Sequence, residues 1–473
     1  MNFQARRIQS LAGSLADRLA GKSLAACRAA AYLAAALVAG PFFFHLARGS
    51  KAYLVPLEDD YYYYAIIADR LVASGKLTFD GTTLTNGFHP LWFLVVTTIR
   101  AMCGRFGTSF YAGFAFVLLG CMVATYELSV RLVRALGAEP PLAAAIGVTF
   151  ALGNDELIAS GMEAAIAVPL FLLLLAEAAR TEPMTPRRAA GLGFIASLAI
   201  LARLDLGLAV AMLIIAWLVL AKPAGRTALC TLTAFGAAGG LVPLYAVANL
   251  FFFGALLPIS ALAKQQLRYW ALNRAYLRFA LFHTQYGHAA GFTLVVGAAA
   301  LLLTLWRGPR GKAEALAVGG VALSFACLFF FCNSLTGWTF FGWYSFPFAA
   351  ALPAALFFAC SRFAHLIPSS SLRVAAAALA VLSPPVLAAR YFVQHGPLGS
   401  IADNSILNMS YQLADKVRER DGLYSMGAIG GVVTYAVGSH YLWTPVSQNL
   451  STPRSHARSA VTMCPTRCLA VQS

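Results

Sequence analysis

The sequence predicts an all-α polytopic membrane protein. Hydrophobic residues make up 59% of the 473 residues and the mean hydropathy is +0.70, whereas soluble domains are roughly 45–50% apolar. Only 11% of the residues are charged, which is less than half of the roughly 25% that is usual for soluble domains. Apolar runs recur along the chain at lengths near the roughly 20 residues needed to cross a bilayer, so about 11–13 transmembrane helices are expected.

The expected helices are the apolar runs, which in chain order are 29–48, 88–103, 110–130, 141–153, 164–179, 189–202, 206–221, 228–253, 291–306, 315–333, 345–363 and 372–390. Several runs are short, so their ends are set only to within a few residues. The net charge of +16 comes mainly from Lys and Arg in the connections between runs. This pattern follows the positive-inside rule of membrane proteins and does not indicate a nucleic-acid partner.

The N-terminus is predicted to be cytoplasmic. No small-residue cleavage site follows the first apolar run, which is therefore expected to remain as an anchor. The basic residues before it are Arg6, Arg7, Arg18, Lys22 and Arg28. Residues 49–87 then form the first outer loop. If every run crosses once, Arg131 and Arg134 fall outside, against their charge. Either a short run within 88–153 does not cross, or one helix is missing from the series.

The first outer loop is longer than a tether between two spans requires. It carries three consecutive acids, Glu58 to Asp60, which are costly to desolvate unless they face water, a cation or a polar substrate. The loop is therefore predicted to carry the chemistry, with a solvated helix start as the alternative. Apolar residues at helical spacing predict a surface helix that ends at Gly75. The tyrosines Tyr61 to Tyr64 are interpreted as an interfacial aromatic belt rather than a platform for a sugar.

Several motifs, taken in order, resemble those of the GT-C membrane glycosyltransferases. The first outer loop and the start of the next run supply Asp59-Asp60-Tyr61 with Ala68-Asp69-Arg70-Leu71, then Gly75, Thr78-Phe79 and Thr85-Asn86-Gly87-Phe88-His89-Pro90-Leu91-Trp92. Ser160-Gly161-Met162-Glu163, Leu201-Ala202-Arg203-Leu204-Asp205 and the segment from Phe253 to Lys264 resemble three later elements. Leu204 stands where that group has proline. The branch that looks most similar contains the mycobacterial terminal arabinofuranosyltransferases and related bacterial proteins.

The resemblance implies a multi-pass enzyme of the bacterial inner membrane, with its active site on the outer face. Its donor would be a polyprenyl-phosphate sugar, and its acceptor an envelope glycan, lipid or protein. An acid of the first outer loop would act as general base on the acceptor hydroxyl. Asp59 is the first candidate for this base, and Asp60 would orient it or help to hold a cation. A divalent cation is thus an open alternative for the cofactor, and no metal ligands are assigned.

Five further residues are candidates for binding at the same face. Lys264, Arg203 and His89 are expected near the leaving phosphate, while Glu163 and Asp205 are expected to hold the acceptor or a cation. Each has a structural alternative. Arg203 and Asp205 can form a clasp at a helix start, Lys264 can extend along the bilayer surface, His89 can close a turn, and Glu163 can begin a helix.

The chain divides into three predicted regions. Residues 1–390 form the GT-C-like transmembrane domain, in which 49–87 carries the catalytic acids. Residues 391–440 are expected to form a partial outer α/β domain, and 441–473 an irregular tail. No acid follows Asp421, and the tail is compatible with a disordered segment or with a frameshifted or truncated gene product.

A polytopic secondary transporter or flippase for an envelope lipid or sugar is the alternative function. Such a protein is expected to show an internal repeat and ionisable residues near the middle of the membrane. The sequence shows no repeat, and its acids gather at one predicted face. The glycosyltransferase is therefore favoured.

Overall fold

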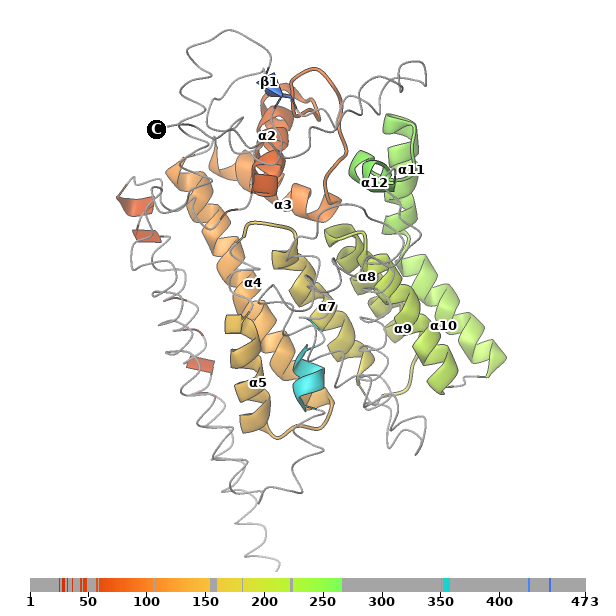
Figure 1. The fold of residues 1–473 in the computed structure, drawn as a ribbon. Coiled ribbons are helices and arrows are strands. Elements are labelled where there is room, and N and C mark those ends of the chain that lie inside the picture. The colour runs from red at the N-terminus through yellow and green to blue at the C-terminus, as the bar shows by residue number, and fades with distance from the viewer. Residues whose placement is uncertain are drawn as a thin grey trace, which may run out of the picture.

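The structure is a computed structural model that describes residues 59–104, 107–153, 160–180, 182–221 and 224–265, together with Leu57, isolated positions between 25 and 48, residues 350 and 352–357, and two short strands. These residues are mainly helical, as predicted (Figure 1). The runs 291–306, 315–333 and 372–390 lie outside the described residues.

Except for α2 and α12, the described helices follow the predicted apolar runs closely. In chain order they are α2 (Asp59–Ser74), α3 (Pro90–Cys103), α4 (Thr108–Ala135), α5 (Pro140–Gly153), α7 (Ala164–Ala178), α8 (Pro186–Ala202), α9 (Leu206–Ala221), α10 (Gly225–Ala238), α11 (Leu241–Phe253) and α12 (Ile259–Gln265). Proline opens α3 and α8. Its lack of an N–H costs nothing there, because the first N–H groups of a helix have no intrahelical partner. Gly254 ends α11 in the left-handed conformation, which glycine adopts without strain.

The run 228–253, predicted as one span, is two helices. α10 and α11 meet at an angle of 47°, and Gly239 and Gly240 separate them. Glycine is a poor helix former, and two in succession weaken the helix at that point. The run is therefore bent at this glycine pair, and its two halves together remain long and apolar enough for one span.

Length and apolar character single out α4 among the described helices as able to cross a membrane alone. Its 28 residues correspond to about 42 Å at 1.5 Å per residue. The bent pair α10 and α11 passes the same test as one span. The shorter apolar helices are α3, Leu142–Ala151, α7 and Leu206–Ile215.

Helix α3 does not carry the chain to the opposite end of the bundle. Trp92 in its first turn packs on Phe114 near the start of α4, with ring centroids 5.8 Å apart. From there α4 runs the length of the bundle beside α7 (Figure 1). Arg131 near its far end pairs with Glu177 near the end of α7, and Glu177 also pairs with Arg180. Arg131 therefore lies at the same end as Arg180, which agrees with the alternative that a run within 88–153 does not cross.

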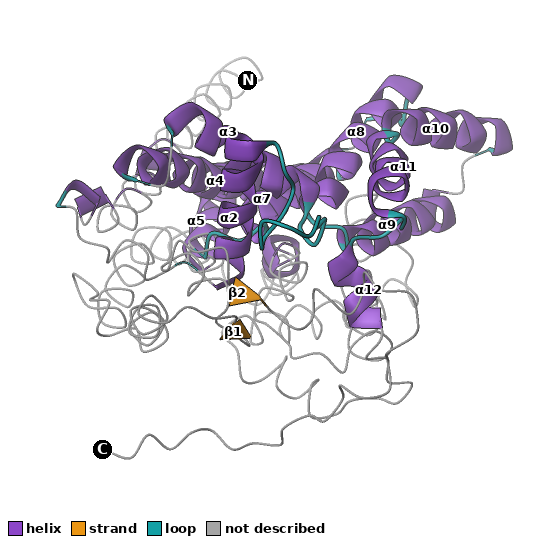
Figure 2. Ribbon diagram, turned by 90° about the horizontal axis from the view of Figure 1, so that it is seen from above, coloured by secondary structure: helices purple, strands orange, loops and turns teal. Residues whose placement is uncertain are grey.

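The core between α2, α3, α4 and α7 is rich in aromatic side chains. Tyr61, Tyr62 and Tyr64 are 0%, 1% and 5% exposed, and Tyr61 packs on Phe114 with ring centroids 4.9 Å apart. The interpretation of these tyrosines as an interfacial belt was therefore wrong for three of the four. Their rings face inward because α2 lies against the bundle, seen from above in Figure 2.

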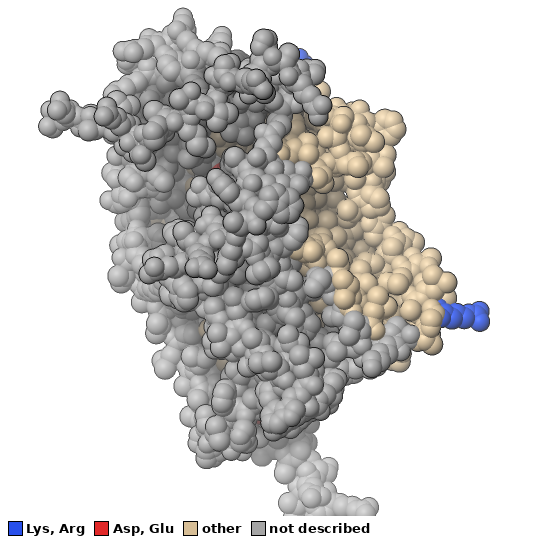
Figure 3. Space-filling view, turned by 45° about the vertical axis from the view of Figure 1, so that its right-hand side comes forward, with Lys and Arg blue, Asp and Glu red and all other residues tan. Residues whose placement is uncertain are grey.

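The outer face of α10 and α11 is apolar. Its exposed large side chains include Leu229, Leu244, Val247, Leu250, Phe251 and Phe252. In Figure 3 the described part of this face is uncharged except for basic side chains at its edges. An exposed apolar surface of this kind is suited to contact with lipid.

Two short parallel strands lie near the end of the chain. β1 (Tyr424–Ser425) pairs with β2 (Leu442–Trp443). β1 falls within the region predicted as a partial α/β domain, and β2 at the start of the region predicted to be irregular. The remainder of 391–473 lies outside the described residues.

Candidate active site

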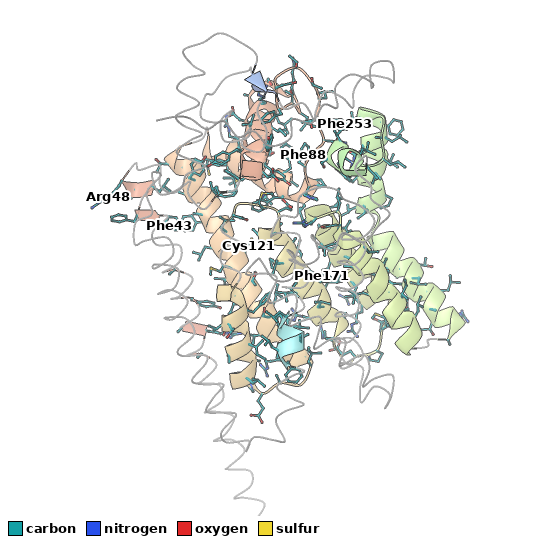
Figure 4. All side chains as sticks on the ribbon, in the orientation of Figure 1. Phe43, Arg48, Phe88, Cys121, Phe171 and Phe253 are labelled. Carbon is teal, nitrogen blue, oxygen red and sulfur yellow. The ribbon has the colours of Figure 1, made fainter. Side chains whose placement is uncertain are left out.

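Five polar residues from four parts of the chain meet at one end of the bundle. They are Tyr64 on α2, His89 just before α3, Glu163 just before α7, and Arg203 and Asp205 between α8 and α9. We call them the polar cluster. In Figure 4, Phe88, the neighbour of His89, lies at this end, whereas Cys121 and Phe171 lie in the middle of the bundle. Helix ends converge here because α7 begins where α8 finishes.

Glu163 is the centre of the polar cluster. It is 2% exposed, its Oε1 accepts a hydrogen bond of 3.1 Å from Arg203 Nη1, and its Oε2 accepts one of 3.1 Å from the Tyr64 hydroxyl. Burial raises the pKa of Glu163, but the neighbouring His89 and Arg203 outweigh this effect and lower the pKa overall. Glu163 is therefore held as a carboxylate, because its buried charge is paired.

Arg203 joins both carboxylates of the polar cluster. It is 1% exposed, and its Nε donates to the two oxygens of Asp205 at 3.1 and 3.0 Å while Nη1 donates to Glu163. Its backbone N–H closes the last turn of α8. The clasp that was the structural alternative for Arg203 and Asp205 is thus present, and it extends to a third residue, Glu163.

The imidazole of His89 is fixed by its neighbours. Its Nδ1 accepts a hydrogen bond of 3.2 Å from the backbone N–H of Leu204, so in the neutral ring the proton is on Nε2. Nε2 lies 3.6 Å from Glu163 Oε1, and the His89 side chain is 26% exposed. The His89 side chain is therefore more exposed than those of Arg203, Glu163 and Asp205, which are 1%, 3% and 15% exposed.

Tyr64 connects the first outer loop to Glu163, and sequence reasoning did not identify it. Its hydroxyl donates to Glu163 and accepts from the backbone N–H of His89 at 3.2 Å. Burial, with the negative charges of Glu163 and Asp60, raises the pKa of Tyr64 well above its ordinary value, so the hydroxyl remains a donor. The available signal was its position one helical turn after Asp60.

The predicted catalytic acids begin α2. Leu57 and Tyr61, which flank them in the sequence, both contact Gly161 in the turn that carries Glu163. A Cβ on Gly161 would lie 2.8 Å from Leu57 Cδ2 and 3.1 Å from Tyr61, and its φ of 75° favours glycine. The start of α2 is therefore packed on the same turn as Glu163. Asp60 is exposed, and the side chain of Asp59 lies outside the described residues.

Lys264 belongs to α12, which docks against the segment before α3. The backbone N–H of Ile259 donates to Asn86 Oδ1 at 3.0 Å, and Asn86 Nδ2 donates to Asn249 Oδ1 at 3.2 Å. The Lys264 side chain lies outside the described residues. Asn86 belongs to the motif that ends at Trp92, but sequence reasoning gave it no role because its partners are 163 and 173 residues away.

A metal centre is not formed by the part of the chain that the structure describes, where no group of three or more His, Cys, Asp and Glu side chains has a suitable arrangement. Glu163 and Asp205 both direct oxygens to Arg203. Any cation at these two carboxylates would have to share their oxygens with the guanidinium.

Comparison with known proteins gives the fold. No protein-family profile and no curated protein matches the sequence. The apo oligosaccharyltransferase of Archaeoglobus fulgidus superposes with a TM-score of 0.54 at 13% identity, over 89% of this chain and 64% of that chain. ArnT from Cupriavidus metallidurans bound to undecaprenyl phosphate gives 0.51 at 15% identity, over 85% of each chain. The chain thus spans less than two-thirds of the oligosaccharyltransferase, and its fold is similar to those of both membrane proteins.

Proposed function

We propose that this protein is an integral membrane glycosyltransferase that transfers a sugar from a polyprenyl-phosphate donor to an envelope glycan, lipid or protein. The observation that carries the proposal is the polar cluster, which lies beneath the start of α2 at one end of an apolar bundle. The undecaprenyl phosphate bound to the Cupriavidus ArnT supports a lipid-linked donor. The reaction would take place at the outer face of the inner membrane.

The proposed reaction is a displacement at the anomeric carbon. The acceptor hydroxyl oxygen attacks that carbon while Asp59 takes the hydroxyl proton. The bond from the anomeric carbon to the phosphate oxygen breaks, and its electron pair leaves with the polyprenyl phosphate. Asp60 orients Asp59 or helps to hold a cation. The contacts of Leu57 and Tyr61 with Gly161 support this arrangement, because they hold the backbone of both acids at the turn of Glu163.

The leaving phosphate needs positive charge or hydrogen-bond donors, and three residues are candidates. Arg203 is 1% exposed and already compensates two carboxylates, so we assign it a structural role, which is to hold these carboxylates in place. His89 and Lys264 are assigned to the phosphate, because α12 docks beside the segment that leads to His89. Glu163 and Asp205 retain lone pairs with which to accept from an acceptor hydroxyl.

The sugar is proposed from the motifs of the first outer loop. These resemble the terminal arabinofuranosyltransferases, so a polyprenyl-phosphate pentofuranose is the first donor to test, with a hexose donor for comparison. A nucleotide sugar is not expected to serve, because the sequence has no glycine-rich nucleotide-binding motif.

The test is transfer by the purified protein in lipid nanodiscs, measured as initial rates at saturating donor. Asp59→Asn should reduce the rate about 10²–10⁴-fold, because the amide keeps the shape but cannot take the proton. Asp60→Asn should cost less, and added divalent cation should partly restore it if Asp60 holds a metal. Lys264→Ala should weaken use of the donor. Lys76→Ala, an exposed change in the same loop, is the control.

Two outcomes would contradict the proposal. Wild-type turnover by Asp59→Asn would show that Asp59 is not the general base. Transfer directly from a nucleotide sugar would show that the donor need not be lipid-linked. Movement of a lipid or sugar across the membrane without any glycosylated product would favour the transporter instead.

A further inference from the structure

We propose that Asn86 is a positioning residue that fixes α12, the helix carrying Lys264, against the segment that carries His89. The part of this inference that concerns Lys264 rests on the proposed function. The part that concerns the placement of α12 stands on geometry alone.

The Asn86 side chain is buried and uses both ends of its amide. It is 1% exposed, and its partner Asn249 is 3% exposed. Oδ1 accepts from the N–H of Ile259 at 3.0 Å, and Nδ2 donates to Asn249 Oδ1 at 3.2 Å. A buried amide is costly unless it is hydrogen-bonded, so these bonds strongly favour one placement of the three segments.

The hydrogen bond from Ile259 to Asn86 caps the N-terminus of α12 with a side chain that is distant in the sequence. The first N–H groups of a helix have no intrahelical partner, and a side chain immediately before the helix usually accepts from one of them. Here Pro258 precedes α12 and offers no such side chain. Asn86 supplies the acceptor from a position 173 residues earlier, so the start of α12 is located by the first outer loop.

A second contact places the same two segments together. A Cβ added to Gly87 would lie 3.9 Å from the Cβ of Ser260 and 4.0 Å from its backbone nitrogen. Two residues later, His89 is held by Leu204 and faces Glu163. The residues from Asn86 to His89 therefore contact α12 on one side and the polar cluster on the other.

The placement of α12 can be tested without any activity. In a cysteine-free background, Gly87→Cys with Ser260→Cys should form a disulfide on mild oxidation, because the expected Cβ separation lies within the roughly 3.5–4.5 Å of disulfides. Adding Asn86→Ala should slow formation of this disulfide about 10-fold or more, a factor that corresponds to about 1.4 kcal/mol. Peptide mass analysis after proteolysis measures the cross-link.

Matched variants keep this test decisive. Thr125→Ala also removes a buried hydrogen bond, but one made to Cys121 within its own helix, so it should leave cross-linking unchanged. Asn249→Ala removes one partner of Asn86 but keeps the bond from Asn86 to Ile259, so it should slow disulfide formation less than Asn86→Ala does. This variant also supplies a second test if Asn86→Ala folds poorly. Equal cross-linking rates in Asn86→Ala and the parent would overturn the positioning role of Asn86, and the absence of the disulfide in the parent would overturn the placement of α12.

The link to Lys264 is tested by a double-mutant cycle on kcat/KM for the polyprenyl-phosphate donor. Asn86→Ala should lower this value about 10-fold, and in the presence of Lys264→Ala it should cost almost nothing more, because both changes act through the same side chain. Independent, multiplying effects would overturn the positioning role. If the wild-type protein transfers no sugar at all, the proposed function fails, whereas the disulfide experiment still decides the placement of α12.

Discussion

Glu163 and Arg203 depend on one another to remain charged. Their side chains are 3% and 1% exposed and lie 3.1 Å apart. A buried ion pair contributes little compared with a well-packed apolar pair, but removal of one partner leaves the other charge uncompensated. The pair therefore fixes the geometry of the polar cluster more than it adds to stability.

We predict that Glu163→Gln lowers the free energy of unfolding by about 3 kcal/mol, because Arg203 keeps only Asp205 as an anionic partner. Glu182→Gln is the control, since its pair with Arg180 is exposed on both sides and is expected to contribute at most about 1 kcal/mol. Denaturant unfolding in detergent measures both. A loss no larger than that of Glu182→Gln would show that Arg203 is compensated in another way.

Asp80 makes the stability of one turn in the first outer loop depend on pH. Partial burial raises its pKa, but the N–H groups of Thr83 and Thr82 and the Thr78 hydroxyl outweigh this and lower it from 3.8 to about 2. Because the folded-state pKa is depressed, the stabilisation of this turn should be complete above about pH 4 and be lost as the pH falls through about 2. Amide hydrogen exchange at Thr82 and Thr83, corrected for intrinsic rates, measures it. Asp80→Asn should remove the pH dependence; an unchanged profile would exclude Asp80 as its source.

The site could be predicted only in part from individual residues. Charged groups in an apolar chain drew attention to His89, Glu163, Arg203 and Asp205, which the structure brings into one hydrogen-bonded group. Tyr64 was missed because a run of tyrosines beside a predicted membrane is usually interfacial. Asn86 had no local signal at all, since both of its partners lie in the second half of the described chain.

At the scale of elements, α8 and α10 pack with their backbones close together. A Cβ on Gly193 would overlap the carbonyl oxygen of Phe235 and lie 2.9 Å from its carbonyl carbon. Backbone atoms cannot rotate away as a flexible side chain can. Small residues at such crossings allow helices in membranes to approach closely.

Gly193→Ala should therefore push α10 away from α8 and lower the free energy of unfolding by about 1–3 kcal/mol. Gly191→Ala, two residues earlier on the same helix, is the control because its added Cβ meets nothing within 4 Å. That change should be neutral or slightly stabilising, since alanine favours helix more than glycine. Similar melting temperatures for the two variants would mean that α10 adjusts without cost.

The helix ends were predictable because apolar runs, prolines and glycines mark them in the sequence. Pro90 and Pro186 open α3 and α8, and both lie close to the predicted starts. The break at Gly239 and Gly240 was also visible as a glycine pair, but the apolar run across it was long enough for one span. Hydrophobic content alone does not distinguish a straight helix from a bent one.

For the whole molecule, the path of α3 decides the topology of the later helices. The sequence alone left it open whether Arg131 lies on the outer or the cytoplasmic side of the membrane, because the length of an apolar run does not show whether the run crosses. The contact of Trp92 with Phe114 places the starts of α3 and α4 at the same end. The arginines Arg131 and Arg180 then gather at the opposite end.

This arrangement predicts which loops an impermeant thiol reagent can reach in intact cells. In a cysteine-free background, Lys76→Cys in the first outer loop should be labelled from outside. Glu139→Cys, beyond the end of α4, should be labelled only after the cells are made permeable. Both positions are exposed in the structure. Labelling of both in intact cells would show that α3 crosses the membrane after all.

The long-range cap of α12 also sets an order of events during synthesis. Asn86 leaves the ribosome 173 residues before Ile259, which at about 5–20 residues per second corresponds to roughly 9–35 s. During that interval the Asn86 amide can be hydrated only if the segment around it stays in contact with water. The inner helices α4 and α7 are complete well before this time, so the docking of α12 on the first outer loop follows their synthesis. A nascent chain halted before Ile259 would hold the inserted helices but an open first loop.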